Sequence, residues 1–381
     1  MVDMRRFCAA LAVLLCLLPV CRGAKAAPAV AAASAILVDG ETGRVLYEKN
    51  SHDRHLIAST TKLMTALVAV ESGTSPDKKI VVKPEYQAEG SSMYLKAGET
   101  LTLRELLYGL LLVSGNDAAL AVAGGCAGDV ETFVGWMNDK AAELGMADTH
   151  FANPNGLDDD AHYSTAADMA LLAREVYHSG ELMEIVSTKS VTLGTRALTN
   201  HNKLLWRYEG CLGMKTGYTD AAGRTLVSCA RRGDQSLIAV TLKDPDDWVD
   251  HAALFDYGFE TYTTYTLARK GTEYRPVRVL GSLVPQVEVE MASTVTYPLT
   301  GEERVRAALR LPAQVEAPVK KGAVAGQLTY YLGDEKIGET YLLYAADVPV
   351  NEPRLTLFQR IWNALRGGGG RALEALLPIR R

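Results

Sequence analysis

The feature that most constrains the fold is a change in hydrophobic pattern at about Tyr262. Before this point, apolar residues at helical spacing recur between strand-like runs. After it, short strand-like runs are separated by glycine, proline and charged turns. The first region predicts a mixed α/β domain and the second a small all-β domain. A length of 381 residues fits two domains with additional terminal segments.

Strands should frame the helices of the first region. Apolar runs at 35–38 and 43–47 enclose a turn-rich connection and predict a β-hairpin. The segment 59–71 predicts a strongly buried helix that begins at Ser59. Further helices are expected at 103–112, 117–123, 130–144 and 166–178, and further strands at 225–229 and 237–242. In the second region, strands are expected at 277–279, 287–290, 295–297, 305–311, 327–332 and 339–344.

The N-terminus has the pattern of a signal peptide. Two arginines at 5–6 precede an apolar run at 7–20 and an A-x-A sequence at 24–26. The run is shorter than the ~20 residues that a membrane span needs, so we expect cleavage near residue 26 and export. A lipid attachment at Cys21 is a weaker alternative, because the residues before it are not small.

The C-terminal segment predicts an amphipathic helix. In 354–366, apolar residues that include Trp362 fall on one arc of a helical wheel, with Arg360 on the other. Tryptophan with arginine is typical of interfacial membrane anchors, which we favour over a helix packed on the β domain. The expected organisation is a signal peptide at 1–26, a mixed domain at 27–262, a β domain at 263–350 and an amphipathic tail at 351–381.

Composition excludes some functions. Hydrophobic residues make up 48% and charged residues 22%, as in an ordinary globular protein, and a net charge of -5 gives no reason to expect binding to nucleic acid. Cys126, Cys211 and Cys229 remain after the signal peptide, with no C-x-x-C pair or histidine cluster among them. We therefore expect free buried thiols, and neither a metal nor a cofactor.

Ser59-Thr60-Thr61-Lys62 is the main candidate for chemistry. Residues three apart on a helix share a face, so the lysine amine can reach the serine hydroxyl. A serine nucleophile needs such a base, and burial or a nearby cation lets a lysine serve. Backbone N–H groups at the helix start point to where an oxyanion would form. The spacing alone is common, and Ser75 with Lys78 repeats it in a turn-like stretch.

Ser114-Gly115-Asn116 follows an apolar run at 110–113 and precedes another predicted helix. Its hydroxyl and amide could pass a proton to a leaving amine and hold a peptide bond. Taken alone, the triplet is better explained as a turn that ends one helix and caps the next.

Lys215-Thr216-Gly217 precedes Tyr218 in a strand-like stretch. On an edge strand that faces the serine, the lysine would supply positive charge, the threonine a hydroxyl for a carboxylate, and the glycine room for a substrate. The alternative for this triplet is an ordinary strand before a turn.

The three motifs occur in the order S-x-x-K, S-G-N, K-T-G. With this order the chain resembles the low-molecular-mass penicillin-binding proteins, the serine D-Ala-D-Ala carboxypeptidases of peptidase family S11. Gly115 stands where class A β-lactamases have aspartate. The resemblance covers about 35–259, with matching segments at 89–96, 114–118, 153–157, 162–165 and 213–219. The segment 322–328 and the tail resemble the family's β domain and membrane anchor less sharply.

The resemblance implies a penicillin-binding transpeptidase-like fold and a reaction on peptidoglycan pentapeptide. Ser59 would attack the carbonyl of the penultimate D-alanine and form an acyl-enzyme, and Lys62 would take the serine proton. Ser114 would relay a proton to the leaving amine, and Asn116 would hold the substrate amide.

The remaining roles fall on the K-T-G strand. Lys215 and Thr216 would receive the free carboxylate beside Gly217, and the backbone N–H groups of Ser59 and Tyr218 would form the oxyanion hole. The resemblance further implies acylation by β-lactams and a location at the extracytoplasmic face of the cell membrane, with the tail on the membrane surface.

One departure concerns the substrate carboxylate. In some relatives a basic residue shortly after the K-T-G strand helps to bind it, whereas here the stretch 243–248 is acidic and leads to His251. A lone histidine is more often structural, so His201 is not included in the catalytic set.

Three alternatives stay open. A β-lactamase would need a dedicated base for deacylation, and no E-x-x-L-N sequence is present. A wall-binding protein without activity is disfavoured by the intact Ser59, Lys62 and Lys215. An endopeptidase would cleave the same type of bond in cross-links.

Overall fold

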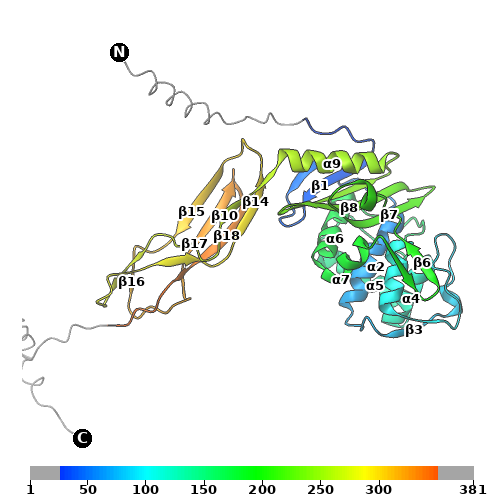
Figure 1. Ribbon diagram of the computed structural model, residues 1–381, viewed down its shortest axis with the longest axis horizontal. Coiled ribbons are helices and arrows are strands. Elements are labelled where there is room, and N and C mark those ends of the chain that lie inside the picture. The colour runs from blue at the N-terminus through cyan, green and yellow to red at the C-terminus, as the bar shows by residue number, and fades with distance from the viewer. Residues whose placement is uncertain (1–25, 351–381) are drawn as a thin grey trace, which may run out of the picture. The chain divides into compact units, whose positions relative to one another are not determined.

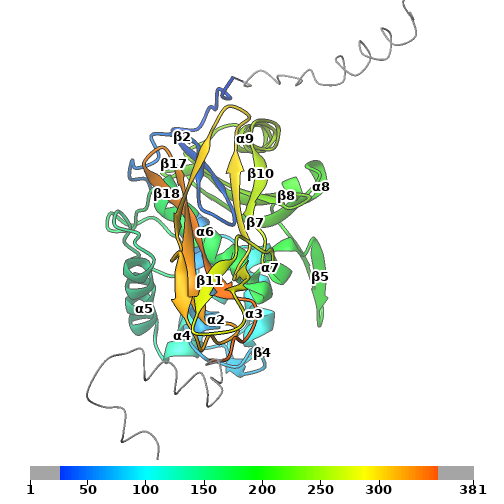
Figure 2. The same ribbon diagram turned by 90° about the vertical axis from the view of Figure 1, so that its left-hand side faces the viewer.

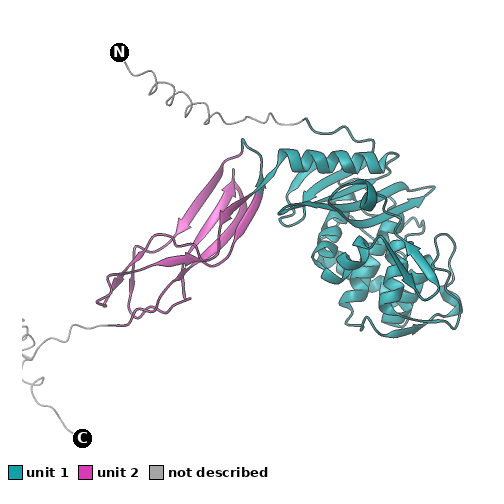
Figure 3. Ribbon diagram, viewed as in Figure 1, with its two compact units in different colours: residues 1–264, 298–302 teal, residues 265–297, 303–381 magenta. Residues whose placement is uncertain are grey.

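The computed structural model describes residues 26–350 (Figure 1). The chain divides into two compact units, each described here separately (Figure 3). The first extends to Thr264 and includes Pro298–Glu302, and the second comprises Tyr265–Tyr297 and the chain from Glu303 onward. The predicted signal peptide, apart from Ala26, and the predicted amphipathic tail lie outside the described residues.

The first unit is built on one five-stranded antiparallel sheet with the order β2-β1-β9-β8-β7. Its strands are β1 (Ser34–Asp39), β2 (Val45–Lys49), β7 (Cys211–Thr219), β8 (Gly223–Arg232) and β9 (Gln235–Leu242). The predicted N-terminal hairpin is present as β1 and β2. The K-T-G strand β7 lies at the edge of the sheet, as predicted.

Alternate residues of the sheet contribute to different cores. Ile36 and Val240 pack into the main core with the helices on one face, whereas Leu37 and Leu237 pack with Phe255 of α9 (Asp247–Thr261) on the other. Successive side chains of a strand point to opposite faces, so both faces of the central strands are covered. Figure 1 shows α9 on one side of the sheet and α2, α5, α6 and α7 on the other.

Five of the six helices that form the main core follow the predicted pattern closely, and the last of them was not predicted. They are α2 (Lys62–Glu71), α3 (Leu103–Leu112), α4 (Asn116–Ala127), α5 (Val130–Glu143), α6 (Ala166–His178) and α7 (Gly180–Ser187). The expected boundaries of α3 and α6 agree with the structure, and both helices have a threonine N-cap, Thr102 and Thr165. Residues 62–69 of α2 are buried, as expected for the central helix. One detail differs, because Ser59 lies in a short 3-10 helix, η1 (Ala58–Thr61), before α2 begins.

Several elements of the first unit were not predicted. They are α7, α8 (Leu204–Arg207), α9, η2 (Pro84–Tyr86) and the strand pairs β3 (Lys79–Val81) with β4 (Thr100–Thr102) and β5 (Ser190–Leu193) with β6 (Arg196–Thr199). Helix α9 contains Gly258, which would ordinarily weaken a helix. A Cβ at this position would lie 2.6 Å from Leu237 Cδ1, so glycine permits α9 to pack closely on β9.

The second unit is all β, as predicted. Its strands are β11 (Val277–Leu280), β12 (Gln286–Val287), β13 (Val289–Met291), β15 (Val305–Arg310), β16 (Gln314–Glu316), β17 (Val324–Leu332) and β18 (Glu335–Tyr344), with β10 (Thr263–Ala268) and β14 (Val295–Leu299) paired at the boundary. They form the sheets β12-β11-β16 and β13-β18-β17-β15. Val289, Leu328 and Leu342 belong to the buried core of this unit.

Two further findings concern the described residues. Cys126, Cys211 and Cys229 are free thiols, as predicted, although only Cys229 is fully buried. Over the range 26–350, no helix combines the length and the apolar character that crossing a membrane requires.

Candidate active site

The structure brings Ser59 and Lys62 together at the start of the central helix. Lys62 Nζ lies 2.8 Å from Ser59 Oγ, within hydrogen-bond distance. Ser59 is half-buried, whereas Lys62 is fully buried. A partly accessible hydroxyl therefore contacts a buried amine, which is the arrangement that an activated serine requires.

Two further oxygens hold the amine of Lys62 in place. Nζ donates to Asn116 Oδ1 at 2.7 Å and to the carbonyl oxygen of Asn155 at 2.5 Å. Burial lowers the pKa of Lys62 well below that of a free lysine, and the charge of Lys215 lowers it further, while Asp117 acts in the opposite direction. The local environment thus favours the neutral amine.

Ser114 and Asn116 lie at the connection between α3 and α4. Ser114 has a left-handed backbone with φ 62°, and Asn116 is the first residue of α4. Asn116 Nδ2 donates to the carbonyl oxygen of Glu89 at 2.6 Å, so its Oδ1 is free to face Lys62. The triplet therefore connects the two helices, as predicted, but provides no side-chain cap for α4, and it brings Asn116 to Lys62.

Lys215, Thr216, Gly217 and Tyr218 follow one another on β7, which contacts η1. Lys215 is buried, and burial lowers its pKa to about 7. Its Nζ donates to the carbonyl oxygen of Thr216 at 2.7 Å. Tyr218 is largely exposed. The edge strand thus places Thr216, Gly217 and Tyr218 in one cavity lining with Ser59, while the amine of Lys215 is buried.

Gly217 lies against the serine itself. A Cβ at this position would stand 2.9 Å from the backbone nitrogen of Ser59 and would also overlap Thr225 Oγ1. The sequence suggested that this glycine leaves room for substrate. In the structure, its missing side chain also allows β7 to approach the N-terminus of η1.

The backbone of η1 is fixed by a buried histidine. His162 Nδ1 accepts from the backbone N–H of Ala152 at 3.1 Å, so Nε2 carries the proton and donates to Thr61 Oγ1 at 2.7 Å. Thr61 Oγ1 donates in turn to the carbonyl oxygen of Ala58. Burial lowers the pKa of His162 to about 4, so the ring stays neutral. This network orients the turn that carries Ser59.

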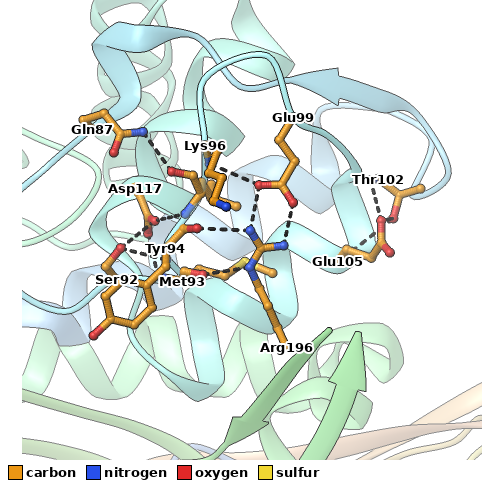
Figure 4. Close-up of polar contacts among 11 residues, drawn as sticks. Gln87, Ser92, Met93, Tyr94, Lys96, Glu99, Thr102, Glu105, Asp117 and Arg196 are labelled. Atoms are coloured by element: carbon orange, nitrogen blue, oxygen red, sulfur yellow. Dashed lines mark hydrogen bonds and ion pairs between the residues drawn. The ribbon is translucent and has the colours of Figure 1, made fainter. Parts of the chain in front are cut away.

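The loop 89–99 is held on two sides (Figure 4). Asp117 accepts from the backbone N–H groups of Met93 and Leu95, each at 2.9 Å. Opposite, Arg196 of β6 pairs with Glu99 at 2.6 and 2.7 Å and donates to the carbonyl oxygen of Met93 at 3.0 Å. These contacts hold the loop on both sides, and its Glu89 carbonyl accepts from Asn116.

An open cavity of about 280 Å³ lies in front of Ser59. Its lining combines hydroxyls, glycine, basic groups and one tryptophan: Ser59, Ser91, Ser114, His201, Lys203, Thr216, Gly217, Tyr218, Arg224, Asp247 and Trp248. Of the predicted site residues, Lys62, Asn116 and Lys215 are buried nearby. The pair Ser75 and Lys78 lies in a turn, where Lys78 Nζ donates to Gly125 O.

Three basic residues in this lining were not in the predicted set, namely His201, Lys203 and Arg224. Arg224 pairs with both carboxylate oxygens of Asp247 at 2.7 and 2.8 Å. The acidic stretch that follows the K-T-G strand thus supplies the partner of a cation on the neighbouring strand. No local pattern indicated this, because the contact joins β8 to the start of α9.

The fold and this geometry fit a class, the acyl-transferring serine hydrolases in which a lysine lies beside the reactive serine. Residues 22–246 match the peptidase S11 family, described as D-alanyl-D-alanine carboxypeptidase, and residues 262–350 match the C-terminal domain of penicillin-binding protein 5. The chain therefore belongs to the peptidase S11 family of serine-type D-alanyl-D-alanine carboxypeptidases.

Individual relatives agree with this assignment. The chain is 34% identical to D-alanyl-D-alanine carboxypeptidase DacF of Bacillus subtilis over 81% of its length and 84% of the relative's. It is 33% identical to DacC of Escherichia coli, with 88% of each chain covered. Penicillin-binding protein 5 of Haemophilus influenzae has a similar structure, with a TM-score of 0.72, 29% identity and coverage of 85% and 99%.

These findings confirm the predicted fold class, family and enzyme activity. The protein is a serine D,D-carboxypeptidase of peptidoglycan metabolism, and an acyl-enzyme and sensitivity to penicillin are general properties of its family. Its substrate lies outside the cytoplasm, in agreement with the expected extracytoplasmic site of action.

Proposed function

We propose that Ser59 is the nucleophile and that neutral Lys62 is its base. Lys62 would take the hydroxyl proton while Ser59 Oγ attacks the carbonyl carbon of the penultimate D-alanine. The carbon–nitrogen bond then breaks, D-alanine leaves, and water hydrolyses the ester. The observation that carries this proposal is the 2.8 Å contact between Lys62 Nζ and Ser59 Oγ, together with the complete burial of the amine.

Ser114 and Asn116 would act on the two sides of the scissile bond. Ser114 lines the cavity with Ser59, so its hydroxyl can relay a proton to the leaving nitrogen. Asn116 would hold the substrate amide. In the free enzyme its Oδ1 contacts Lys62, and its Nδ2 contacts Glu89.

Lys215 and Thr216 would receive the carboxylate of the leaving D-alanine. An anion nearby would stabilise the charged form of Lys215, whose pKa is lowered to about 7 in the free enzyme. The charge of Lys215 would in turn favour the neutral form of Lys62. Lys203 adds positive charge to the same cavity, whereas the charge of Arg224 is paired with Asp247.

The oxyanion hole would consist of the backbone N–H groups of Ser59 and Tyr218. What supports it is the close approach of Gly217 to the Ser59 nitrogen, since Tyr218 is the next residue of the strand. Two such donors stabilise the tetrahedral intermediate by several kcal/mol, at roughly 3 kcal/mol each.

β-Lactams would acylate Ser59 and remain bound. Among the described residues that line the cavity, the carboxylate is that of Asp247, and Arg224 already pairs with it. One nitrogen of Arg224, Nη2, donates to both oxygens of this carboxylate at 2.7 and 2.8 Å, so a water molecule would have to compete with a cation for the carboxylate. We therefore expect a slowly hydrolysed penicilloyl-enzyme and no sustained penicillin turnover.

The decisive experiment compares Ser59→Ala with Ser75→Ala, which alters the serine of the S-x-x-K sequence in the turn. Wild type and Ser75→Ala should release D-alanine from a pentapeptide and bind fluorescent penicillin, with peptide mapping placing the label on Ser59. Ser59→Ala should do neither. A label on another residue, or D-alanine release by Ser59→Ala, would disprove the assignment.

We further propose that residues 1–26 direct export and that the tail binds the extracytoplasmic membrane surface. The proposed organisation is a catalytic domain at 27–262, a β domain at 263–350 and an anchor at 351–381. Support comes from the apolar arc that includes Trp362 in the sequence. Deletion of residues 354–381 should abolish binding to anionic vesicles while D-alanine release persists, and unchanged binding would exclude the anchor.

A further inference from the structure

An apolar turn projects from one end of the β unit. The stretch 279–287 contains no charged residue, and its turn 281–285 joins β11 to β12. At the tip of this turn, Leu283 is 76% exposed, and its neighbour Val284 is exposed as well. A single exposed apolar side chain is ordinary on a soluble protein, whereas two together at the tip of a turn form a protrusion suited to an apolar partner.

Hydrogen bonds close the turn and keep its tip outside the core. The backbone N–H of Val279 donates to the carbonyl oxygen of Pro285 at 2.9 Å. Ser282 Oγ accepts from the backbone N–H of Val284 at 3.2 Å. Val279 and Val287, which flank the turn, are buried in the core of the unit. The apolar tip is therefore carried by a closed turn and takes no part in that core.

The last described residues lie at the same end of the unit. The backbone N–H of Ala317 donates at 2.9 Å to the carbonyl oxygen of Leu280, the residue before the turn. Two residues further on, Val319 pairs with Val348, and the described chain ends at Val350. Figure 1 shows β16, which pairs with β11, at the end of the unit where the described chain stops, and Figure 2 views the unit from this side. The turn therefore lies beside the point from which the predicted tail continues.

Positive charge accompanies the apolar tip. Lys320 and Lys321 directly follow Val319 and are both exposed. The backbone N–H of Lys321 donates to Asp347 Oδ1 at 2.9 Å, and the backbone N–H of Ala323 donates to the carbonyl oxygen of Lys320 at 3.1 Å, so the turn that carries the two amines is fixed. This end of the unit thus combines apolar side chains with two amines, which is the combination that binds a membrane surface containing anionic lipid.

We propose that the turn 281–285 is a second membrane contact, in which Leu283 and Val284 enter the lipid interface while Lys320 and Lys321 bind anionic headgroups. This inference rests on the proposed membrane anchor, which belongs to another part of the chain. Two apolar side chains alone bind a membrane weakly, but beside an anchor they act at a high effective concentration. Two contacts at one end also fix the orientation of the β unit against the membrane, which a single attachment does not.

Two observations favour a lipid surface over a protein partner. A stable protein interface covers about 800 Å² on each partner, far more than the two side chains of this tip present. A protruding apolar tip needs no complementary shape in order to enter a lipid interface. The second observation is the position of the turn beside Val350, since an anchor that begins there would hold the tip close to the membrane.

Vesicle binding tests the apolar tip with the full chain, without its signal peptide. The double variant Leu283→Ser with Val284→Ser should bind vesicles of phosphatidylglycerol and phosphatidylethanolamine about tenfold more weakly than the wild type. Leu283→Trp should bind them about threefold more tightly, because tryptophan favours the membrane interface. Val81→Ser is the matched control, at an apolar residue of β3 that is 57% exposed, and should change nothing. All these variants should release D-alanine from a soluble pentapeptide at the wild-type rate.

The double variant Lys320→Gln with Lys321→Gln tests the role of charge. A basic residue near an anionic lipid surface contributes about fivefold to affinity, so the double variant should lose about tenfold or more on vesicles that contain phosphatidylglycerol. On vesicles of phosphatidylcholine alone, this variant and the wild type should bind equally. An equal loss on both kinds of vesicle would contradict a contact with anionic headgroups.

The outcomes separate the turn from the anchor. A wild type that binds no vesicles would overturn both. Unchanged binding by Leu283→Ser with Val284→Ser, or an equal loss in Val81→Ser, would overturn the contact at the turn and leave the anchor intact. Loss of binding in the double variant, with unchanged binding after deletion of residues 354–381, would support the turn and overturn the anchor. A dimer in solution that the double variant abolishes would make a second copy of the chain the partner and overturn the lipid contact.

Discussion

Lys62 and Lys215 are two buried amines of one site, and within the described chain neither forms an ion pair with a carboxylate. Burial lowers the pKa of both groups, that of Lys215 to about 7, and the charge of Lys215 further lowers the pKa of Lys62. Two positive charges in one sealed site repel each other, so the first proton leaves readily. The pair can therefore keep a neutral amine beside Ser59 at neutral pH.

The first prediction concerns the pH dependence of acylation. Because a lowered pKa leaves Lys62 neutral where a free lysine is charged, acylation by benzylpenicillin should stay fast at pH 7. It should fall only as the pH decreases through the apparent pKa of the pair. Stopped-flow measurements of the acylation rate from pH 5 to 10 follow this decrease, the acidic limb of the pH profile. A limb centred near ~10.4, the pKa of a free lysine, would show that the base is misassigned.

Lys62→Arg provides the matching variant. Arginine carries a positive charge at all accessible pH values, so it cannot take the proton of Ser59. It should lower the acylation rate constant by about a thousandfold or more, with no recovery up to pH 10. Recovery at high pH would mean that another group acts as the base.

The second prediction is that Lys215→Met stabilises the fold at low pH. A lysine whose pKa is lowered to about 7 by burial costs free energy while it is charged. Below pH 7 the folded and unfolded states both carry the charge, so the variant should gain its full advantage, on the order of 1–2 kcal/mol. Between pH 7 and ~10.4 the folded protein has lost this proton and the unfolded chain has not, so the advantage should decrease progressively as the pH rises and be lost near ~10.4.

Urea unfolding at pH 6 and pH 9.5, followed by tryptophan fluorescence, measures this difference. The variant also loses the hydrogen bond from Lys215 Nζ to Thr216 O, which lowers its free energy of unfolding by about 1 kcal/mol at both pH values. The difference between the two pH values is therefore unchanged. An advantage that is independent of pH would contradict the prediction. The variant should also lose D-alanine release, because the cation for the carboxylate is gone.

The third prediction concerns Gly217→Ala. The added methyl group would press on the Ser59 nitrogen from 2.9 Å and on Thr225, so either β7 or η1 must shift. Displacement of an oxyanion donor typically costs about 100-fold or more in rate. We expect penicillin acylation to slow by this factor while the melting temperature falls only a few degrees.

Gly135→Ala is the matched control for this substitution. Gly135 lies in α5, and a Cβ there would meet no atom within 4 Å. The variant should keep the wild-type acylation rate and gain about 0.5–1 kcal/mol of stability, because alanine favours a helix interior. Equal rates for Gly217→Ala and Gly135→Ala would show that the approach of β7 to Ser59 has no catalytic role.

Helices and strands that depend on neighbouring residues in the sequence could be predicted. Helices α3 and α6 have threonine caps and regular apolar spacing, and their predicted boundaries agree with the structure. The pair β5 and β6 was missed because part of its support is remote. Arg196 of β6 contacts Glu99, 97 residues away, and no local pattern carries such a contact. Helix α9 was missed for a similar reason, since Gly258 is explained only by the approach of Leu237.

The same distinction applies to the site. Ser59 and Lys62 are related by helical spacing, so their contact could be predicted from the sequence. The placement of Lys203 and Arg224 on the cavity wall depends on how α8 and β8 pack, and it appeared only in the structure. His162 was part of a matching segment, but its link to Thr61 joins residues 101 apart.

The last prediction follows from the clamp on the loop 89–99 (Figure 4). Arg196 donates to the carbonyl oxygens of Met93 and Tyr94, and the side chain of Asn116 depends on the same loop through the Glu89 carbonyl. Loss of Arg196 should therefore leave Asn116 less well placed without removing any group that reacts. Arg196→Ala should lower kcat for D-alanine release about tenfold, since small misplacements in a site are costly.

Three measurements separate positioning by Arg196 from a general loss of stability. The acidic limb of the pH profile should stay close to its wild-type position, because the pKa of Lys62 is lowered mainly by burial and by Lys215, neither of which depends on the loop. Arg196→Lys should recover only part of the rate, as an amine cannot make the paired contacts with Glu99 at 2.6 and 2.7 Å. Arg54→Ala, which breaks the exposed pair with Asp148, is the matched control and should leave kcat unchanged. Equal losses in Arg196→Ala and Arg54→Ala, or full recovery by lysine, would show that the clamp on the loop does not position Asn116.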